Sequence, residues 1–233
     1  MAKSLPFISG KVAEKGNASY QEYAAHYGGQ RINAIRELPK KGMPLDQIMK
    51  RVHKGEIDSR VCYEQEKISG AVYIADQKHW DFINDVMGRY VVTNPLHSDE
   101  YKMVTQFEAE VIRMCCNMYN GDKNTCGLIS SGGTESIILS VLAYREKALE
   151  RGVTKPNMVM SNSAHAAFDK AAFFCQVELR KVPVTKDCRC DFKALKAQVD
   201  SNTIMVVSSA PDYPYGNYDP LPQIAKLAQS WGI

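Results

Sequence analysis

Apolar residues recur along this chain at two different spacings, and the second half of the sequence alternates between them. Short apolar runs typical of buried strands alternate with stretches in which apolar positions repeat every three or four residues, as in helices. The predicted strands are Cys126–Ile129, Asn157–Met160, Val177–Val184 and Thr203–Ala210. The predicted helices between and after them are Glu135–Gly152, Ala164–Cys175, Asp191–Val199 and Leu221–Gln229. This alternation predicts an α/β domain with a mostly parallel sheet and flanking helices.

The first part of the chain is more polar and less regular. Helical spacing occurs in Leu45–Lys54, Asp76–Tyr90 and Asp99–Asn120, and Ile68–Tyr73 is expected to be a short strand or extended segment. We therefore expect residues 1–98 to form an N-terminal helical arm and residues 99–233 to form the first part of a large α/β domain. Because the last three residues resemble the start of another buried strand, we expect the sheet to be incomplete at the C-terminus of this chain.

Composition and charge limit the possible functions. The chain has 233 residues, of which 45% are apolar and 24% charged, and its formal net charge of +3 argues against nucleic acid as a partner. Residues 1–60 contain 11 Lys and Arg against 6 Asp and Glu. This basic segment would suit an anionic membrane face, although a solvated arm is the simpler interpretation. With no signal peptide or membrane-spanning stretch apparent, a soluble cytoplasmic protein is expected.

The seven cysteines do not indicate a metal site. The chain has no CxxC pair, and no histidine lies near a cysteine pair at the spacing of zinc ligands. Free thiols in a reducing compartment fit this pattern best. We therefore expect no metal.

The stretch SSGGTES, which begins at Ser130, lies where a predicted strand hands over to a predicted helix. Backbone N–H groups at a helix start form an anion site together with the helix dipole, and Gly132 and Gly133 would let a phosphate approach closely. Ser131 and Thr134 would add hydroxyl donors. The stretch matches neither the Walker A pattern nor the GxGxxG fingerprint. Spacing alone leaves open an alternative in which Ser131 or Thr134 simply caps the helix.

A histidine, His165, follows the predicted strand Asn157–Met160. Ligands of open parallel sheets gather at the carboxyl ends of the strands, where an imidazole could stack on a flat aromatic cofactor. The alternative is a helix-start histidine satisfied by a backbone carbonyl. Tyr73, Asn94 and His97 lie on irregular segments of the kind that often serve ligands, although each alone could be a surface or turn residue.

Taken together, these features and their neighbours resemble one known family. The chain from about Leu38 to Ile233 resembles the sphingosine phosphate lyases, pyridoxal-phosphate-dependent enzymes that share their fold with the group II amino-acid decarboxylases. The stretches that support this resemblance are SGAVY, TNPLH, FEAEVI, SSGGTES, NSAHAAFDKAA and PDYPYGNYDP. The resemblance implies a fold type I transferase-like α/β architecture, with pyridoxal 5′-phosphate as the cofactor of the domain formed by residues 99–233.

The resemblance also implies roles for individual residues. Cofactor binding is implied for Gly132, Gly133, Thr134, His165 and Asn94, a catalytic role for His165 and Tyr73, and binding of the substrate phosphate for Ala71, Tyr73 and His97. Some of these residues would serve a neighbouring subunit's site, which implies a homodimer.

The implied reaction is the retro-aldol cleavage of a phosphorylated long-chain base to a fatty aldehyde and ethanolamine phosphate. The family's Schiff-base lysine and its pyridine-pairing aspartate lie downstream of Ile233, and Lys170 follows His165 too closely to be that lysine. A complementary chain or remainder carrying the C-terminal part is therefore expected. Two alternatives are an amino-acid decarboxylase, which needs no second phosphate pocket, and a catalytically inert fragment that acts only as a dimerisation partner. Peripheral membrane contact would bring the protein to its lipid substrate.

Overall fold

The computed structural model describes residue 38 and residues 40–64 and 76–233, without the side chains of residues 56–64. The chain divides into two compact units, Met1–Arg89 and Tyr90–Ile233, which are described separately below. The segment Ile68–Tyr73, predicted to be extended, lies outside the described residues.

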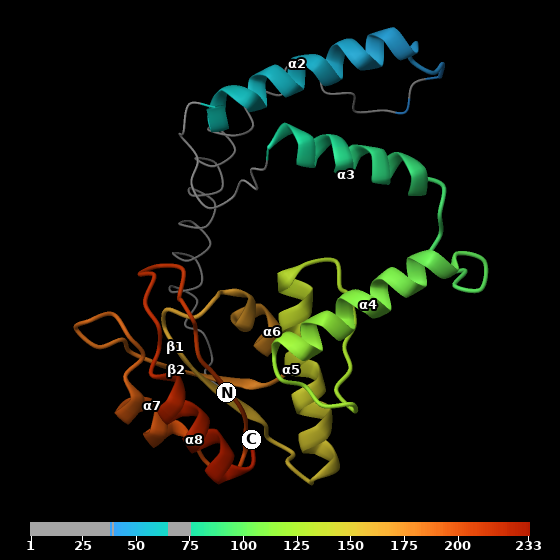
Figure 1. The fold of residues 1–233 in the computed structure, drawn as a ribbon. Coiled ribbons are helices and arrows are strands. Elements are labelled where there is room, and N and C mark those ends of the chain that lie inside the picture. The colour runs from blue at the N-terminus through green and yellow to red at the C-terminus, as the bar shows by residue number, and fades with distance from the viewer. Residues whose placement is uncertain (1–37, 39, 65–75) are drawn as a thin grey trace. The chain divides into compact units, whose positions relative to one another are not determined.

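The described part of the first unit consists of two helices, α2 (Leu45–Glu64) and α3 (Gln77–Tyr90) (Figure 1). Helix α2 begins directly after Pro44, as predicted, but extends well past the expected end at Lys54. It continues through Gly55, which a helix tolerates at a cost of about 1 kcal/mol. Asp76 caps α3, since its Oδ1 accepts a hydrogen bond of 2.8 Å from the backbone N–H of His79.

The second unit contains a parallel sheet with the strand order β2-β1-β3. Its strands are β1 (Asn157–Ser161), β2 (Glu178–Val182) and β3 (Thr203–Val207). Its helices are α4 (Lys102–Met118), α5 (Gly133–Glu150), α6 (Ala167–Cys175), α7 (Phe192–Gln198) and α8 (Leu221–Trp231). The central strand β1 is buried along its whole length, which explains why its middle residues, Met158–Met160, are all apolar rather than alternating.

Two hydrophobic clusters lie on opposite faces of this sheet. Met158 of β1 packs with buried residues of α5 and α6, including Val141 and Ala171. The next residue, Val159, packs with buried residues of α7 and α8, including Leu195. This alternation follows from the two-residue period of a strand and places one pair of helices on each face, as Figure 1 shows.

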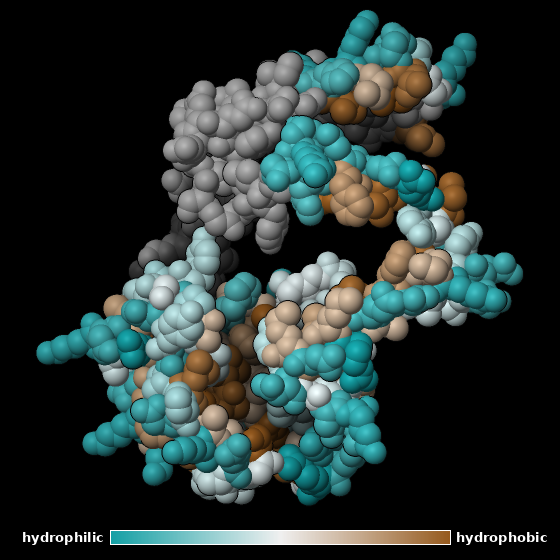
Figure 2. Space-filling model, viewed as in Figure 1, coloured by the Kyte–Doolittle hydropathy of each residue, from teal (hydrophilic) through white to brown (hydrophobic). Residues whose placement is uncertain are grey.

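The hydrophobic side chains of this unit are not all covered. In Figure 2 hydrophobic residues gather near the middle of the unit's visible face, with hydrophilic residues around them. Large apolar side chains that are exposed in the described part of the unit include Met114, Leu128, Phe173 and Phe174. A folded chain exposes scattered apolar residues routinely, but several such residues on neighbouring elements mark surfaces that bind other polypeptide or ligand.

One predicted strand is absent from the described residues, and two others end earlier than predicted. Cys126–Ile129 is irregular, because no described segment pairs with it, and its Leu128 and Ile129 remain 64% and 54% exposed. Strand β2 ends before Pro183, which has no N–H to donate to a ladder; only an isolated bridge from Val184 to Cys190 follows. Strand β3 ends at Val207 rather than Ala210.

The C-terminal residues form a helix cap. Gly232 adopts a left-handed conformation with φ of 69°, and the N–H of Ile233 donates to the carbonyl of Ala228 at 3.1 Å. Ile233 then packs against the cluster that contains Val159. Gly232 thus caps α8 and Ile233 reaches the core, and the start of a further strand stays a prediction.

A polar network ties the amino ends of β1 and β3 together. The Arg180 guanidinium donates to Asp200 Oδ2 at 2.6 Å, and the Asn157 amide donates to Asp200 Oδ1 at 2.9 Å. The Thr203 hydroxyl in turn donates to Asn157 Oδ1 at 2.8 Å. Hydrogen bonds from Arg180 and then Asn157 lower the pKa of Asp200 to about 2.

We expect the substitution Leu195→Ala to lower the free energy of unfolding by about 2–5 kcal/mol, because it leaves a cavity at a fully buried position. Chemical denaturation followed by circular dichroism measures this change. The control is Leu149→Ala at a partly exposed position of α5, with an expected loss below about 1 kcal/mol. Equal losses in the two variants would contradict the assignment of Leu195 to the core.

Acid should weaken the fold through Asp200. Its folded-state pKa is depressed from 3.8 to about 2, so its stabilising contribution is complete above about pH 4 and is lost as the pH falls toward 2. Asp200→Asn should therefore flatten the dependence of stability on pH in this window, as measured by melting temperature. Asp99→Asn, at an exposed position, serves as the control and should leave the slope as it is in the parent protein.

Candidate functional site

The loop Ser130–Gly132 is organised by its own short hydrogen bonds. The Ser130 hydroxyl donates to the carbonyl of Gly132 at 3.0 Å and lies 2.6 Å from the Ser136 hydroxyl. The backbone N–H of Ser131 donates to Glu135 Oε2 at 2.6 Å. Hydrogen bonds from the Ser131 hydroxyl and backbone lower the pKa of Glu135, so this carboxylate is charged and already occupied.

Helix α5 begins at Gly133 without a side-chain cap. The N–H of Ser136 is the first to find an intrahelical acceptor, the carbonyl of Gly132 at 3.0 Å. Within the described residues, the N–H groups of Gly133, Thr134 and Glu135 have no hydrogen-bond acceptor. The alternative in which Ser131 or Thr134 caps the helix is therefore not what the structure shows.

The approach to these three amides is open. A methyl group added at Gly132 or Gly133 would meet no atom within 4 Å, and Thr134 is exposed. Free donors at the positive end of an 18-residue helix form an anion site, and their geometry suits the oxygens of a phosphate group. The loop thus has the donors and the open space that a phosphate ligand requires.

His165 lies in the short loop between β1 and α6 and is exposed. Its Nδ1 accepts a hydrogen bond of 3.0 Å from the backbone N–H of Ala167, which fixes the orientation of the ring. A neutral imidazole with Nδ1 as acceptor carries its proton on Nε2. The partner is thus a backbone amide and not the carbonyl considered from the sequence.

The topology brings the start of α5 and His165 to the same edge of the sheet. Helix α5 precedes β1 and α6 follows it, and a short loop makes each connection. Both helices therefore run opposite to the strand and parallel to each other (Figure 1). Cys175, the last residue of α6, contacts the second turn of α5, with its Sγ 3.8 Å from the carbonyl of Ile138. That contact places the start of α6 within about one turn of the level of the start of α5, toward the carboxyl end of β1.

Asn94 and His97 form a turn ahead of α4. Asn94 Oδ1 accepts from the N–H of Leu96 at 3.1 Å, and its carbonyl accepts from the N–H of His97 at 3.0 Å. Both side chains are exposed, and the described contacts do not join them to the glycine loop or to His165. Ala71 and Tyr73, the other predicted substrate-phosphate residues, lie outside the described residues.

Two polar groups that were not predicted lie at the carboxyl end of β3. Ser208 Oγ and Asp212 Oδ2 are buried and have no hydrogen-bond partner within the described residues. Ser208 was counted among the residues of the strand, and only the true end of β3 at Val207 reveals it as an edge position. Ser208, Ser209 and Asp212 follow the apolar strand closely in the sequence, and such polar residues could have indicated a ligand site at this edge.

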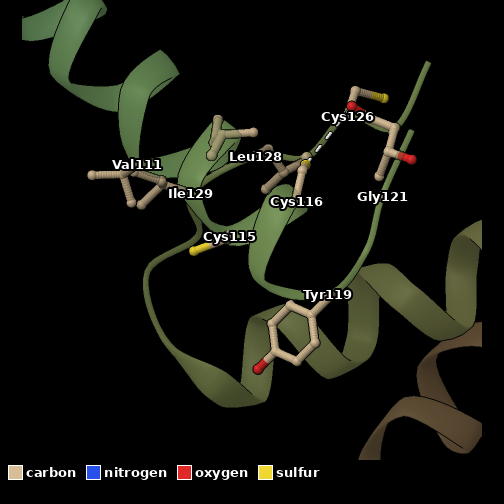
Figure 3. Close-up of a pocket in the computed structure, with 11 residues that line it drawn as sticks. Val111, Cys115, Cys116, Tyr119, Gly121, Cys126, Leu128 and Ile129 are labelled. Atoms are coloured by element: carbon tan, nitrogen blue, oxygen red, sulfur yellow. Dashed lines mark hydrogen bonds between the residues drawn. The ribbon is translucent and has the colours of Figure 1, made fainter. Parts of the chain in front are cut away.

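A separate apolar cavity of about 300 Å³ lies between α4 and the segment that leads to the glycine loop. Its lining includes Val111, Cys115, Tyr119 and Leu128 and contains no charged side chain (Figure 3). The Cys116 thiol does not point into open space but contacts the carbonyl of Thr125 at 3.7 Å. The cavity suits apolar groups rather than the charged groups of a cofactor.

The cysteines of the described segments are free thiols. Burial, followed by the nearby charge of Asp219, raises the pKa of Cys190 to about 12, which makes it an unreactive core residue.

Among the described residues there is no group of three or more His, Cys, Asp or Glu that could hold a metal ion. No helix in those segments is long and apolar enough to cross a membrane.

Solved structures share this fold. The sphingosine-1-phosphate lyase of Burkholderia pseudomallei superposes with a TM-score of 0.80 at 32% identity, covering 91% of this chain and 49% of that one. The glutamate decarboxylase of Lactobacillus brevis has a TM-score of 0.68 at 17% identity, over 88% of this chain and 48% of that one, which is a likeness of fold alone. These neighbours confirm the predicted fold class of a pyridoxal-phosphate-dependent α/β enzyme.

The sequence itself identifies the family. Residues 30–233 match the pyridoxal-dependent decarboxylase conserved domain, and the chain therefore belongs to that family. Among curated relatives, it is 34% identical to sphingosine-1-phosphate lyase 1 of Rattus norvegicus over its full length and 35% identical to sphingosine-1-phosphate lyase of Arabidopsis thaliana. The chain spans 41% and 44% of the lengths of these two relatives.

The substitution Gly133→Ala tests the glycine loop as a phosphate site. Stability should not fall, because the added methyl group meets open space and alanine favours a helix over glycine. Binding of pyridoxamine 5′-phosphate, which lacks the aldehyde and cannot react with surface lysines, should weaken by roughly tenfold or more as the methyl group obstructs the amides. Isothermal titration calorimetry measures the affinity.

The matched control is Gly88→Ala in α3, where an added methyl group also meets no atom within 4 Å. This variant should bind the ligand as the parent protein does. If Gly133→Ala also kept the parent affinity, the amides at the start of α5 would not be the phosphate site.

Proposed function

We propose that the complete protein is a pyridoxal-phosphate-dependent carbon–carbon lyase that cleaves phosphorylated long-chain bases, such as sphingosine 1-phosphate. The products are a fatty aldehyde and ethanolamine phosphate. The similarity to relatives named sphingosine-1-phosphate lyase, which extends over 98–100% of this chain, supports this proposal. The structural observation that carries it is the uncapped start of α5, whose three free N–H groups match a phosphate group at the edge that also holds His165.

The residues present fit the cofactor. Gly132 and Gly133 leave room for its phosphate, and the N–H groups of Gly133, Thr134 and Glu135 supply the hydrogen bonds. His165 lies at the same edge with its ring oriented by the Ala167 N–H, as a residue that stacks on a pyridine ring requires. When bound, pyridoxal phosphate supplies an aldehyde that captures the substrate amine and a ring that accepts the electron pair of the cleaved bond.

The substrate must be held at two chemically different ends. In this proposal Ala71, Tyr73 and His97 bind its phosphate, and Asn94 contributes to the cofactor side. A histidine suits phosphate binding, since a ring N–H can donate a hydrogen bond to a phosphate oxygen. Tyr73 and His165 are the candidate catalytic residues. In this proposal the catalytic lysine comes from a polypeptide segment other than these 233 residues.

Assembly and location complete the proposal. A homodimer, or a pairing with a chain that carries the C-terminal part, would complete the site. The basic N-terminal segment would bring a cytoplasmic protein to the anionic membrane face where long-chain bases reside.

A second candidate is an amino-acid decarboxylase, because the matching domain is named for that activity and the fold is shared with a glutamate decarboxylase. Such an enzyme would keep the cofactor loop and His165 but would have no need of His97 as a phosphate ligand. The two candidates therefore differ in what a change at His97 does.

The assay uses the full-length gene product with pyridoxal phosphate and sphinganine 1-phosphate, and it measures ethanolamine phosphate and fatty aldehyde. We expect turnover of this substrate and no release of carbon dioxide from amino acids. His97→Ala should reduce turnover by roughly 10- to 100-fold, the loss expected for one hydrogen bond to a charged group.

His79→Ala, at an exposed position of α3, provides the control and should retain parent activity. Carbon dioxide release from an amino acid, without cleavage of the phosphorylated base, would instead favour the decarboxylase. Neither activity, together with no binding of the cofactor, would favour an inert protein that acts only through association.

A further inference from the structure

The loop Ser208–Pro220, which follows β3, is closed at its base by Asp219. Asp219 Oδ2 accepts from the N–H of Ser209 at 2.8 Å, and Oδ1 accepts from the N–H of Cys190 at 2.9 Å. The N–H of Asp219 donates back to the carbonyl of Ser209 at 3.1 Å. Asp219 is only 5% exposed, and both of its carboxylate oxygens have partners. It is a structural carboxylate.

Asp212 in the same loop is different. It is 3% exposed, and its Oδ1 accepts from the N–H groups of Tyr215 at 3.2 Å and Asn217 at 3.1 Å, which shapes the loop. Its Oδ2 is buried and has no partner within the described residues, and the same is true of Ser208 Oγ. Buried polar atoms are nearly always hydrogen-bonded, because an unpaired one loses its water without compensation. The described part of the fold therefore offers these two atoms no hydrogen-bond partner, and a ligand could supply one.

Ser208 lies at the edge that carries the candidate site, and Asp212 belongs to the loop that follows it. Strands β1 and β3 are adjacent and parallel, and Met160 pairs with Val207 in their register. Ser208 therefore follows β3 at the level of Ser161, from which the chain leads to His165. In parallel sheets this carboxyl edge is where ligands bind.

The chemistry of the pair restricts the ligand group. A carboxylate oxygen only accepts hydrogen bonds, whereas a serine hydroxyl can donate one. A ligand hydroxyl both donates and accepts, so it can satisfy the two atoms together. Under the proposed function, the substrate's amine is engaged by the cofactor and its phosphate has its own site. The substrate's 3-hydroxyl, on one of the two carbons joined by the bond that breaks, is the polar group that still needs a binding partner.

We propose that Asp212 Oδ2 and Ser208 Oγ bind the 3-hydroxyl of the phosphorylated long-chain base and so position the bond that breaks. This inference rests on the proposed function for the identity of the ligand. The unpaired state of the two atoms does not depend on that identity. Asp212 and Ser208 are then determinants of specificity for hydroxylated bases.

The first test uses melting temperatures to decide whether Asp212 is a ligand-binding residue or a structural one. Asp212→Asn keeps an oxygen for the Tyr215 and Asn217 N–H groups and changes only the unpaired position, so the melting temperature should stay equal or rise. Asp219→Asn is the matched control and should melt several degrees lower, since its new NH₂ group opposes a backbone N–H. A fall in Asp212→Asn as large as that in Asp219→Asn would overturn the inference.

The second test compares two ligands that differ by one hydroxyl. With pyridoxamine 5′-phosphate present, the protein should bind sphinganine 1-phosphate roughly tenfold more tightly than its 3-deoxy analogue, as calorimetry measures. Asp212→Asn and Ser208→Ala should reduce this preference to near unity while binding of the 3-deoxy analogue stays unchanged.

The outcomes separate this inference from the proposed function. Equal binding of the two ligands by the parent protein, or a preference that survives in both variants, would refute the inference and leave the proposed function standing. If the parent protein bound neither ligand, the proposed function would fail and the hydroxyl assignment with it. The melting temperatures would still decide whether Asp212 is structural.

Discussion

Burial of the central strand β1 between two helical layers is the constraint on which the rest of the structure depends. Because Met158 and Val159 point to opposite faces, helices must cover both sides, and each must run opposite to the strand. Every loop that follows a strand, and the start of α5, then lie at one edge. The candidate site is therefore a consequence of how the core is packed and not of any single motif.

At that edge some polar groups have hydrogen-bond partners within the described fold and others do not. The hydroxyl of Ser130 and the N–H of Ser131 have partners within the loop, whereas the first amides of α5 have no acceptor in the part of the chain that the structure describes. Asp219 is fully paired, whereas one oxygen of Asp212 is buried with no partner among the described residues. A protein retains such groups at a cost in stability, which is characteristic of sites that bind a ligand.

Much of this arrangement could be predicted from the sequence, because β1, its helices and the glycine loop follow from local periodicity and turn chemistry. Cys126–Ile129 could not, since an apolar run becomes a strand only when another segment pairs with it. The length of α2 depended on whether Gly55 would end the helix. Asp212 was missed because hydrogen-bond satisfaction is a property of three-dimensional surroundings. The roles of Ala71, Tyr73 and His97 come from family resemblance alone.

The central claim is that the free amides at the start of α5 hold the phosphate of pyridoxal phosphate. Nuclear magnetic resonance tests it directly, through the amide signals of Gly133, Thr134 and Glu135 during a titration with pyridoxamine 5′-phosphate. The account predicts that these three signals shift together and saturate, while the amide of Ser131, already bonded to Glu135, moves less. Unchanged signals for the three amides, with shifts confined to another part of the protein, would contradict it.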